Sequence, residues 1–511
     1  MLVTEHRSRG TGDGMSRLFV DVTTSLMLAG DLPIGISRVE GEIARRLLLS
    51  SDLHSIPVVF RNDGQMLALS PEQLARIFSA RPVADSKGIR VRALGGSSVA
   101  VAAEPAAVSA ADQPAPHPPT RPLKIRLWLR VAAEMRRAAR VSIACIPGAV
   151  REDIRAILIH VRQIVRTVIH MRRGSVPAPP IYIPAVRDEI IPTLRMVVHP
   201  RPGDVLWTAG LYRNFVPLRT IAETRVRTGL RVVTICYDLI RLAHPQFNAP
   251  SMGAELFAAD AIALLDASDL VLAISETTRR DLLNYATRIG RAAPAVQVVR
   301  LGSDLSMREM RNEHKDSRSL PTDLARRRFA LAVGTVEPRK NYRLLLRVWE
   351  RLSADPTFLC DLVIVGRPGF EAEDSILEIE RSPLFGSRVL WVECCPDEML
   401  RQLYDACHVV LCPSFAEGWG LPIAEALSLG RHVIASNRGA MIEASQGFGR
   451  LLDPEDEESW AAAIAAAASA PRLEVDLPDP PNWDATAAAV KDHLRRFVTR
   501  WDGSKHAYPP T

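Results

Sequence analysis

The sequence lacks any uninterrupted apolar stretch of the roughly 20 residues that a helix needs to cross a membrane. At the N-terminus, His6, Arg7 and Arg9 are not followed by an apolar run, so we expect no secretory signal peptide. These two absences predict a cytoplasmic protein. If it works at the inner face of the cytoplasmic membrane, we expect it to lie on that surface as a peripheral protein.

Cysteines are few and follow no pattern. The 511 residues include seven of them, an odd number without a repeated C-x-x-C spacing, which argues against a disulfide framework and favours a reducing compartment. The adjacent Cys394 and Cys395 would point to opposite faces of a strand, which argues against a metal site there. No D-x-D pair stands at the end of a predicted strand. We therefore predict that the protein requires neither a metal ion nor another cofactor.

Lysine is scarce, with six lysines among the 64 basic residues. The sequence has no Lys-rich tail, zinc finger or RNA-binding signature. The net charge of +6 at pH 7 is a modest basic excess that would favour anionic partners without pointing to nucleic acid. We therefore expect no nucleic-acid partner.

Short apolar segments alternate with helix-like segments, a rhythm typical of doubly wound parallel sheets. The length and the 47% content of hydrophobic residues suit two such domains, so we predict an α/β fold with two Rossmann-like domains. The predicted strands are residues 17–22, 56–60, 204–208, 231–236, 269–274 and 298–301 in the first group, and 329–334, 361–365, 388–392, 408–411 and 432–436 in the second.

Changes in composition divide the chain. We assign residues 1–15 to a disordered lead, 16–306 to the first domain, 307–328 to a linker, 329–475 to the second domain, and 476–511 to a connector and a last helix. The first domain carries an insert at about residues 97–175. Its first part, 97–122, is rich in Ala, Pro and Ser, and we expect it to be flexible.

The rest of the insert, residues 123–173, is strongly basic, and its apolar residues recur at helical spacing around Trp128. A basic amphipathic segment of this kind suits an anionic membrane surface. A pair of helices that pack on the first domain and expose their arginines to solvent is the alternative. The sequence leaves both interpretations open.

The stretch from Pro413 to Glu425 follows a predicted buried strand and places Gly418 and Gly420 just before a helix start. A glycine loop at a helix N-terminus favours a phosphate, because the backbone comes close to the ligand and unpaired N–H groups face it. Glu417 lies in the loop and Glu425 about one turn into the helix. A sugar nucleotide has a reactive end for the first carboxylate and a hydroxyl-bearing end for the second.

A second loop of this kind opens the second domain. Gly334 and Thr335 follow a strand, and Arg339 and Lys340 precede a helix, so helix N–H groups and two adjacent cations could bind a diphosphate. A capped helix with solvated charges is the alternative. Because lysine is scarce in this chain, Lys340 is not simply its default cation.

Two more loops in the first domain carry candidate residues. Gly35 stands between a strand and a helix to about Leu49, where an ordinary turn is the alternative. Tyr237 and Asp238 follow the strand 231–236, and ligands of open α/β sheets bind beyond the carboxyl ends of strands. Asp238 is therefore a candidate acceptor-side residue, unless it only orders its loop.

These motifs resemble those of retaining glycosyltransferases of family 4. Residues 413–425, with Gly439 and Glu443 downstream, resemble the family's E-x7-E signature, and residues 334–341 resemble its G-T-x-E-P-R-K-N motif. Overall, the chain resembles bacterial polysaccharide and O-antigen mannosyltransferases. The resemblance implies the GT-B architecture, in which two Rossmann-like domains face a cleft and the last helix crosses back to the first domain.

The chain departs from the family pattern in one block at two positions, and Thr335 stands where some relatives carry an arginine. Residues 237–240 resemble the family's H-D-L-I-P block, but Tyr237 stands in place of the usual histidine and Arg241 in place of the common proline. The resemblance still implies Asp238 and Tyr237 on the acceptor side.

Roles for the remaining candidates follow from the resemblance. Arg339 and Lys340 would contact the donor diphosphate, Glu417 would hold sugar hydroxyls and offset charge at the anomeric carbon, and Glu425 would bind the ribose hydroxyls. The expected catalytic set is Glu417, Lys340 and Arg339, and the expected donor-binding set is Gly418, Trp419, Gly420, Leu421, Glu425, Gly334, Thr335 and Gly35.

The expected function is retaining transfer of a hexose, with a slight preference for mannose, from a nucleotide-diphosphate sugar. The acceptor would be a hydroxyl of a glycan or lipid-linked glycan in surface polysaccharide biosynthesis. Another enzyme of the same architecture, such as a sugar phosphorylase or epimerase, is one alternative. A non-catalytic scaffold or partner subunit is the other.

Overall fold

The computed structural model describes residues 16–29, 35–61, 64–79, 89–92, 98–101, 190–210, 217–247, 254–303, 327–476 and 482–499. The chain divides into two compact units, residues 1–102 with 185–511, and residues 103–184. The second unit, with the predicted basic segment 123–173, lies outside the described residues. The predicted lead and most of the predicted flexible tract and linker lie outside them as well.

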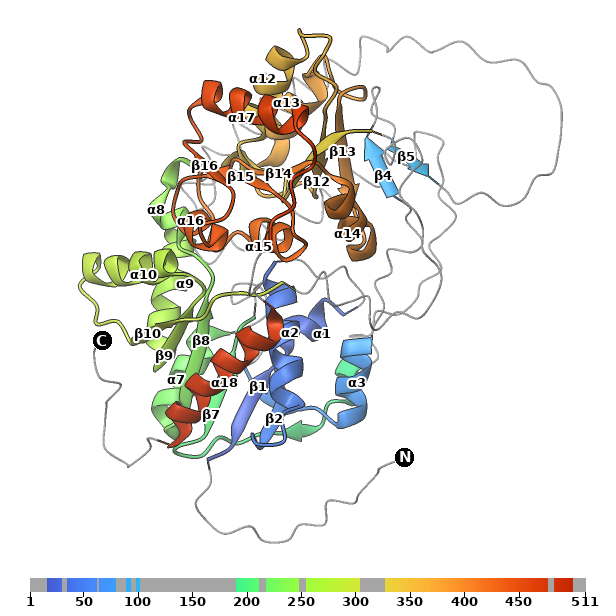
Figure 1. Ribbon diagram of the computed structural model, residues 1–511. Coiled ribbons are helices and arrows are strands. Elements are labelled where there is room, and N and C mark those ends of the chain that lie inside the picture. The colour runs from blue at the N-terminus through green and yellow to red at the C-terminus, as the bar shows by residue number, and fades with distance from the viewer. Residues whose placement is uncertain are drawn as a thin grey trace, which may run out of the picture. The chain divides into compact units, whose positions relative to one another are not determined.

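The first sheet has the strand order β10-β9-β8-β7-β1-β2-β3-β6 (Figure 1). From β10 to β2 all neighbours are parallel, whereas β3 and β6 pair antiparallel at one edge. Alternate residues of β1 enter different core clusters, Phe19 one of them and Val20 the other, so both faces of the sheet are buried. The strands are β1 (Leu18–Asp21), β2 (Ser55–Phe60), β3 (Met66–Ala68), β6 (Met196–Val197), β7 (Val205–Thr208), β8 (Arg231–Cys236), β9 (Leu270–Ala273) and β10 (Ala295–Val298).

The second sheet has the order β16-β15-β14-β11-β12-β13-β4-β5 and is parallel from β16 to β13. In β11, Leu331 and Ala332 also enter different core clusters. The two parallel α/β sheets confirm the predicted fold class. The strands are β4 (Ile89–Arg92), β5 (Ser98–Val101), β11 (Phe329–Val333), β12 (Asp361–Val365), β13 (Val389–Cys394), β14 (Val409–Cys412), β15 (Val433–Ser436) and β16 (Arg450–Leu452).

Helices connect the strands of each sheet, and we call each sheet with its helices the first and the second domain. The first domain has α1 (Thr23–Met27), α2 (Ile36–Leu48), α3 (Pro71–Ser79), η2 (Ile191–Thr193), α7 (Leu218–Thr228), α8 (Ile240–Ala243), η3 (Pro245–Phe247), α9 (Ala254–Ala267) and α10 (Glu276–Arg288). The second domain has η5 (Pro338–Lys340), α12 (Tyr342–Leu352), α13 (Ala372–Arg381), α14 (Asp397–Ala406), α15 (Leu421–Ser428), α16 (Ala440–Ser445) and α17 (Glu457–Ser469).

Strands β4 and β5 differ from the sequence prediction. Their residues were assigned to the first domain, and Ser98–Val101 to the flexible tract, yet β4 pairs antiparallel with β13 of the second sheet and β5 pairs with β4 (Figure 1). The physical reason is that β13 would otherwise end the sheet with unpaired N–H and C=O groups. The sequence prediction contained no strand at residues 89–92 or 98–101 and so missed this pairing.

The last strand of the first sheet also differs. The sequence predicted a strand at 298–301, whereas β10 covers Ala295–Val298 and pairs in register with β9, Ala295 opposite Leu270. Val299 and Leu301, which follow β10, are buried in the core although they lie outside the strand. These two residues are therefore apolar because they are buried in the core, although the strand has already ended.

The final helix, α18 (Trp483–Thr499), packs against α2 of the first domain (Figure 1). Arg46 of α2 forms an ion pair with Asp484 at 2.5 Å, and the Lys491 ammonium donates to Ser50 Oγ at 2.6 Å. Trp483, at the start of α18, is 2% exposed. Apolar burial and these polar contacts together hold α18 against the first domain.

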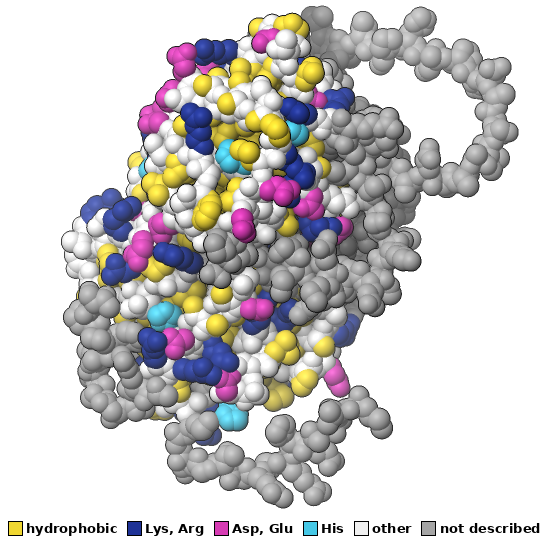
Figure 2. Space-filling model, in the orientation of Figure 1, with side chains coloured by type: hydrophobic (Ala, Val, Ile, Leu, Met, Phe, Trp, Pro, Cys, Tyr) yellow, Lys and Arg dark blue, Asp and Glu magenta, His cyan; other side chains and the backbone are white. Residues whose placement is uncertain are grey.

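Basic and acidic side chains lie interspersed on the face of the protein shown in Figure 2. Ion pairs at the surface of the described residues include Arg347 with Glu457 and Arg438 with Asp453. None of the helices within the described residues is both long and apolar enough to span a bilayer.

Candidate functional site

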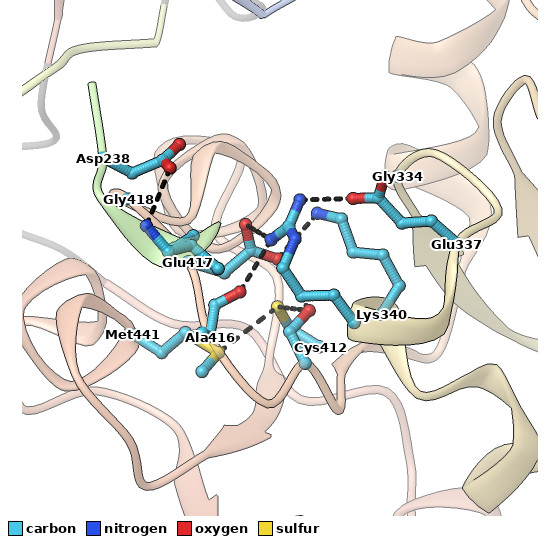
Figure 3. A network of polar contacts seen from close by, with 12 residues as sticks. Asp238, Gly334, Glu337, Lys340, Cys412, Ala416, Glu417, Gly418 and Met441 are labelled. Carbon is cyan, nitrogen blue, oxygen red and sulfur yellow. Dashed lines mark hydrogen bonds and ion pairs between the residues drawn. The ribbon is translucent and has the colours of Figure 1, made fainter. Parts of the chain in front are cut away.

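The candidate site is built where two neighbouring parallel strands of the second domain end. β11 and β14 pair with Ala330 opposite Val409, and their carboxyl ends therefore open at the same edge of the sheet. The chain leaves β11 through Gly334 into η5, and it leaves β14 into the loop before α15. This geometry brings together Arg339, Lys340 and Glu417, which the sequence had predicted as a catalytic set (Figure 3).

Glu417 is the centre of the site. Its Oε1 accepts hydrogen bonds from the Lys340 ammonium and from Ser414 Oγ, both at 2.6 Å, and its Oε2 accepts from the Arg339 guanidinium at 2.7 Å. The side chains of Glu417 and Lys340 are 9% and 10% exposed. Charge-assisted hydrogen bonds of this length are the strong ones, so the three side chains hold one another in fixed positions.

Two cations set the charge of Glu417. Burial alone would raise the pKa of this carboxyl, but Arg339 and Lys340 outweigh burial and lower the pKa to about 2. Burial works against the charged form of Arg339 as well, yet Glu417 and Glu337 raise the pKa of this guanidinium further above its already high value. The Glu417 carboxylate and the Arg339 guanidinium are therefore both charged at any physiological pH.

Arg339 is anchored by more than Glu417. Its Nη1 also donates to the Ala416 carbonyl at 2.6 Å, and its Nη2 donates to Glu337 Oε1 at 2.5 Å. A guanidinium has five N–H donors and an ammonium has three. Among the described residues, no acceptor contacts the Nε–H and the second Nη2–H of Arg339 or the two remaining N–H groups of Lys340, so these donors can face a ligand.

Gly334 makes room for the ammonium group. It has a φ of +151°, and a Cβ at this position would lie 3.0 Å from both Cε and Nζ of Lys340. Its carbonyl accepts a hydrogen bond from the Tyr342 hydroxyl at 2.8 Å. The half-buried Thr335 follows. A side chain in place of Gly334 would be strained at this φ and would crowd the end of the Lys340 side chain.

Sequence reasoning missed the supporting residues Ser414, Glu337 and Asn341. Asn341 has a φ of +55°, which Asn tolerates better than most residues, and its Nδ2 donates to the carbonyls of Pro413 and Pro454. It thereby ties the loop after η5 to the loop that carries Glu417. A signal was available, because Glu337 and Asn341 stand inside the motif that contains Arg339.

The predicted donor-binding residues 418–421 differ in burial, and their contact with a donor stays a prediction. Gly418 is half-buried, Gly420 is the N-cap of α15 with a positive φ, and Leu421 packs partly buried against the core. Trp419 is 3% exposed and belongs to the core, so its side chain supports the loop from within. Only the backbone of Trp419 is left for a ligand.

Glu425 lies in α15 and pairs with a residue of the first domain. Its Oε1 accepts from Arg38 of α2 at 3.2 Å and its Oε2 from the Tyr404 hydroxyl at 2.8 Å. Arg38 also pairs with Asp397 at 2.5 Å. Gly35 is the N-cap of α2, three residues before Arg38, and Arg38 contacts the second domain.

The acceptor-side candidates follow β8. Asp238 is accessible to solvent, although the neighbouring protein displaces part of its hydration shell and raises the pKa of its carboxyl; Arg339 lowers this pKa, and Glu417 raises it. The Tyr237 hydroxyl donates to the Ala209 carbonyl, inside the first domain. Figure 3 shows Asp238 next to Gly418 and Glu417. The charges of Arg339 and Glu417 thus act on the Asp238 carboxyl, whereas the Tyr237 hydroxyl is bound within the first domain.

The site lies within a segment that matches a known family. Residues 327–469 match the family model of group 1 glycosyl transferases. This segment is a group 1 glycosyltransferase domain. It runs from just before β11 to the end of α17 and includes the whole Glu417 cluster.

Curated relatives of the chain are also glycosyltransferases by name. The chain is 30% identical over 244 residues to O-antigen chain mannosyltransferase B of Escherichia coli, a match covering 46% of this chain and 60% of the relative. It is 30% identical over 220 residues to D-inositol 3-phosphate glycosyltransferase of Rhodococcus opacus (strain B4), a match covering 40% of this chain and 49% of the relative. The chain thus spans less than two thirds of either relative. The predicted resemblance to O-antigen mannosyltransferases is confirmed.

Among solved structures, the chain is similar to sucrose-phosphate synthase from Thermosynechococcus elongatus, with 20% identity and a TM-score of 0.44. That match covers 58% of this chain and 74% of the other. Within the residues that the structure describes, no group of three His, Cys, Asp or Glu side chains is placed to hold a metal ion. Transfer without a metal stays a prediction.

Proposed function

We propose that the protein is a retaining glycosyltransferase acting in surface polysaccharide biosynthesis. It moves a hexose, with mannose as the first candidate, from a nucleotide-diphosphate sugar to a hydroxyl of a glycan or lipid-linked glycan. The observation that carries this proposal is the buried pairing of Glu417 with Arg339 and Lys340 inside the glycosyltransferase domain. The relative named O-antigen chain mannosyltransferase B supports the choice of sugar and product.

The cations would stabilise the leaving nucleoside diphosphate. Within the described residues, Arg339 and Lys340 keep N–H donors without a protein acceptor. Their partners Glu417 and Glu337 hold them in place beforehand, and Ser414 in turn donates to Glu417. Donors fixed before the reaction cost no reorganisation when the leaving group gains charge, which makes this kind of stabilisation large.

Glu417 would act as a fixed negative charge. With a pKa of about 2, its carboxyl carries no proton to donate at neutral pH and cannot serve as a general acid. Its oxygens can instead accept hydrogen bonds from sugar hydroxyls and offset positive charge that develops at the anomeric carbon.

Asp238 is our candidate for contact with the acceptor. It follows a strand of the first domain, is open to solvent and has a raised pKa beside the cluster. A carboxylate with a raised pKa is a better proton acceptor than an ordinary aspartate. It would orient the acceptor hydroxyl, and the leaving phosphate would assist in removing its proton.

Nucleotide binding is the first test. Thermal unfolding would be compared across GDP, UDP, ADP and their sugars for the wild type, Lys340→Ala and Glu425→Gln. Lys491→Ala is the matched control, because Lys491 lies in α18 and pairs with Asp52 of the first domain. We expect one nucleotide family to stabilise the wild type and Lys491→Ala, with a loss in the other two variants, because a ligand that binds only the folded state stabilises it.

The stereochemistry is the second test. The matching α-configured nucleotide sugar would be supplied with an oligosaccharide acceptor, and the new linkage would be assigned by NMR. An α linkage supports retention, and a β linkage contradicts it. Binding of the nucleotide with no transfer to any acceptor would favour a scaffold, whereas a demand for free phosphate would favour a phosphorylase.

A further inference from the structure

The N-terminus of α10, in the first domain, is capped by a carboxylate from the second domain. Oε2 of Glu443, in α16, accepts from the Glu276 N–H at 2.8 Å. Its Oε1 accepts from the Thr277 N–H at 2.9 Å and from the Thr277 hydroxyl at 2.7 Å. Helix N-termini carry unpaired N–H groups and a partial positive charge, so a carboxylate is a favourable partner there.

The same end of α10 contacts the loop that carries Glu417. Ser275, the N-cap of α10, accepts from the Thr278 N–H at 3.0 Å and donates its hydroxyl to the Gly418 carbonyl at 2.8 Å. Ser275 is fully buried. The residue that caps the helix thus also fixes the neighbour of Glu417.

Two glycines allow the domains to meet this closely. A Cβ on Gly418 would lie 2.3 Å from the Tyr237 carbonyl oxygen, so a side chain cannot be accommodated without movement of the backbone. A Cβ on Gly439, the N-cap of α16, would lie 3.3 Å from Cγ2 of Thr277. We call this set of contacts, made by Tyr237, Ser275, Glu276 and Thr277 with Gly418, Gly439 and Glu443, the α10 joint.

The α10 joint separates two requirements of the proposed function, on which this inference rests. Donor binding needs Arg339, Lys340 and Glu417, which all belong to the second domain. Transfer also needs the acceptor beside Asp238, which follows Tyr237 in the first domain. The joint is therefore positioned to fix the acceptor side relative to the donor side while leaving the donor contacts themselves intact.

We propose that Glu443 is a positioning residue for transfer. It acts through α10 and the Gly418 carbonyl to hold Asp238 at a fixed place relative to Glu417. Small misplacements of reacting groups are costly, since an error of about 1 Å can reduce a rate by about a hundredfold. The joint has many contacts, so the loss of one of its carboxylate bonds produces only part of this effect.

The test uses the full chain and separates affinity from rate. In Glu443→Gln, an amide N–H2 replaces one acceptor oxygen and faces a backbone N–H. We expect kcat to fall about tenfold, while the donor Kd, measured by calorimetry, stays within about twofold because every donor contact remains. Glu457→Gln, which removes a partly exposed carboxylate paired with Arg347 in the same domain, should change neither.

A second pair of variants isolates one hydrogen bond. Thr277→Val keeps the side-chain shape but loses the hydroxyl that donates to Glu443, whereas Thr277→Ser keeps that hydroxyl. We expect kcat to fall about threefold in the first and to be retained in the second. Hydrogen exchange of the Glu276 and Thr277 amides should accelerate in Glu443→Gln, because both amides lose their anionic acceptor.

The outcomes are distinguishable. An unchanged kcat and unchanged amide exchange in Glu443→Gln would overturn the inference while the proposed function stands. A parallel loss of kcat, donor affinity and melting temperature would reduce Glu443 to a folding contact and also overturn it. A wild-type protein that binds no nucleotide would instead overturn the proposed function, and the transfer role of Glu443 with it.

Discussion

Two buried glutamates, one in each domain, differ in charge at neutral pH. Glu417, in the second domain, lies against Arg339 and Lys340, and its pKa is lowered to about 2. Glu40, in α2 of the first domain, is fully buried near Asp21; burial first and the aspartate second raise its pKa to about 8. The same side chain is therefore an anion in one domain and a neutral acid in the other.

The partners explain the difference. Glu40 Oε1 accepts from the Ser25 N–H at 2.6 Å and from the Ser25 hydroxyl at 2.8 Å. These two hydrogen bonds do not offset the cost of burying its charge beside Asp21. Glu417 meets two cations, so its charge is kept. Buried charge with matched cations thus marks the candidate site, whereas a buried carboxyl held by hydroxyl and amide groups serves the packing of the first domain.

The largest effect should come from removing the charge of Glu417. In Glu417→Gln the two cations lose their shared anion, and the sugar loses a fixed negative charge. We expect kcat to fall by about 10² to 10³, the range found when one preorganised electrostatic contact is removed. Transfer rates at saturating donor would measure this, and a variant within tenfold of the wild type would contradict the role given to Glu417.

The Glu417 carboxylate should also make the free energy of unfolding depend on pH in the acid range. Because its folded pKa lies below its unfolded value of 4.5, the contribution of Glu417 is fully present above about pH 4.5 and is lost as the pH falls toward 2. The shift corresponds to about 3 kcal/mol. Urea unfolding of the wild type and Glu417→Gln between pH 6 and pH 2.5 should show two curves that converge. Parallel curves would argue against the lowered pKa.

The contribution of Glu40 to stability should change with pH in the opposite direction to that of Glu417. Its folded pKa exceeds the unfolded value, so the folded protein holds a proton that the unfolded chain has released, and stability falls as the pH rises from about 4.5 to about 8. Glu40→Gln cannot ionise, so we expect it to be more stable than the wild type by up to about 5 kcal/mol at pH 9 and nearly equal to it at pH 4. A variant that is less stable at both pH values would contradict the protonated state.

The smallest effect should come from Arg38, where the two domains share one ion-pair network. Arg38 reaches Asp397 and Glu425 at once, a geometry that a planar guanidinium satisfies and an ammonium does not. We expect Arg38→Lys to weaken nucleotide binding about threefold through loss of the contact that orients Glu425. Arg46→Lys, which changes the same residue type in α2, should have no effect on nucleotide affinity.

Much of the second domain could be predicted from the sequence. β12 has the predicted bounds, and Arg339, Lys340 and Glu417 meet as expected because loops after adjacent parallel strands open at one edge. The contacts of Arg38 and Glu443 could not be predicted in this way. They join residues 387 and 167 positions apart, and each depends on how two separately patterned domains are placed.

The segment of the first domain's chain that joins the second sheet was harder to predict. The apolar and basic alternation of Ile89–Arg92 is typical of a strand, but nothing in it names the partner strand. The positive φ of Asn341 and the burial of Trp419 likewise follow from tertiary packing. Local pattern specified the elements, and the three-dimensional arrangement decided which of them meet.

The pairing of β4 with β13 bears on how such proteins can be recombined. A second domain exchanged between relatives by cutting at residue 327 would leave behind the strand that covers its outer edge. The transplanted sheet would then offer β13 as an open template to any extended chain nearby. A functional chimera must therefore carry residues 89–101 together with the donor half, so the unit of exchange is discontinuous in the gene.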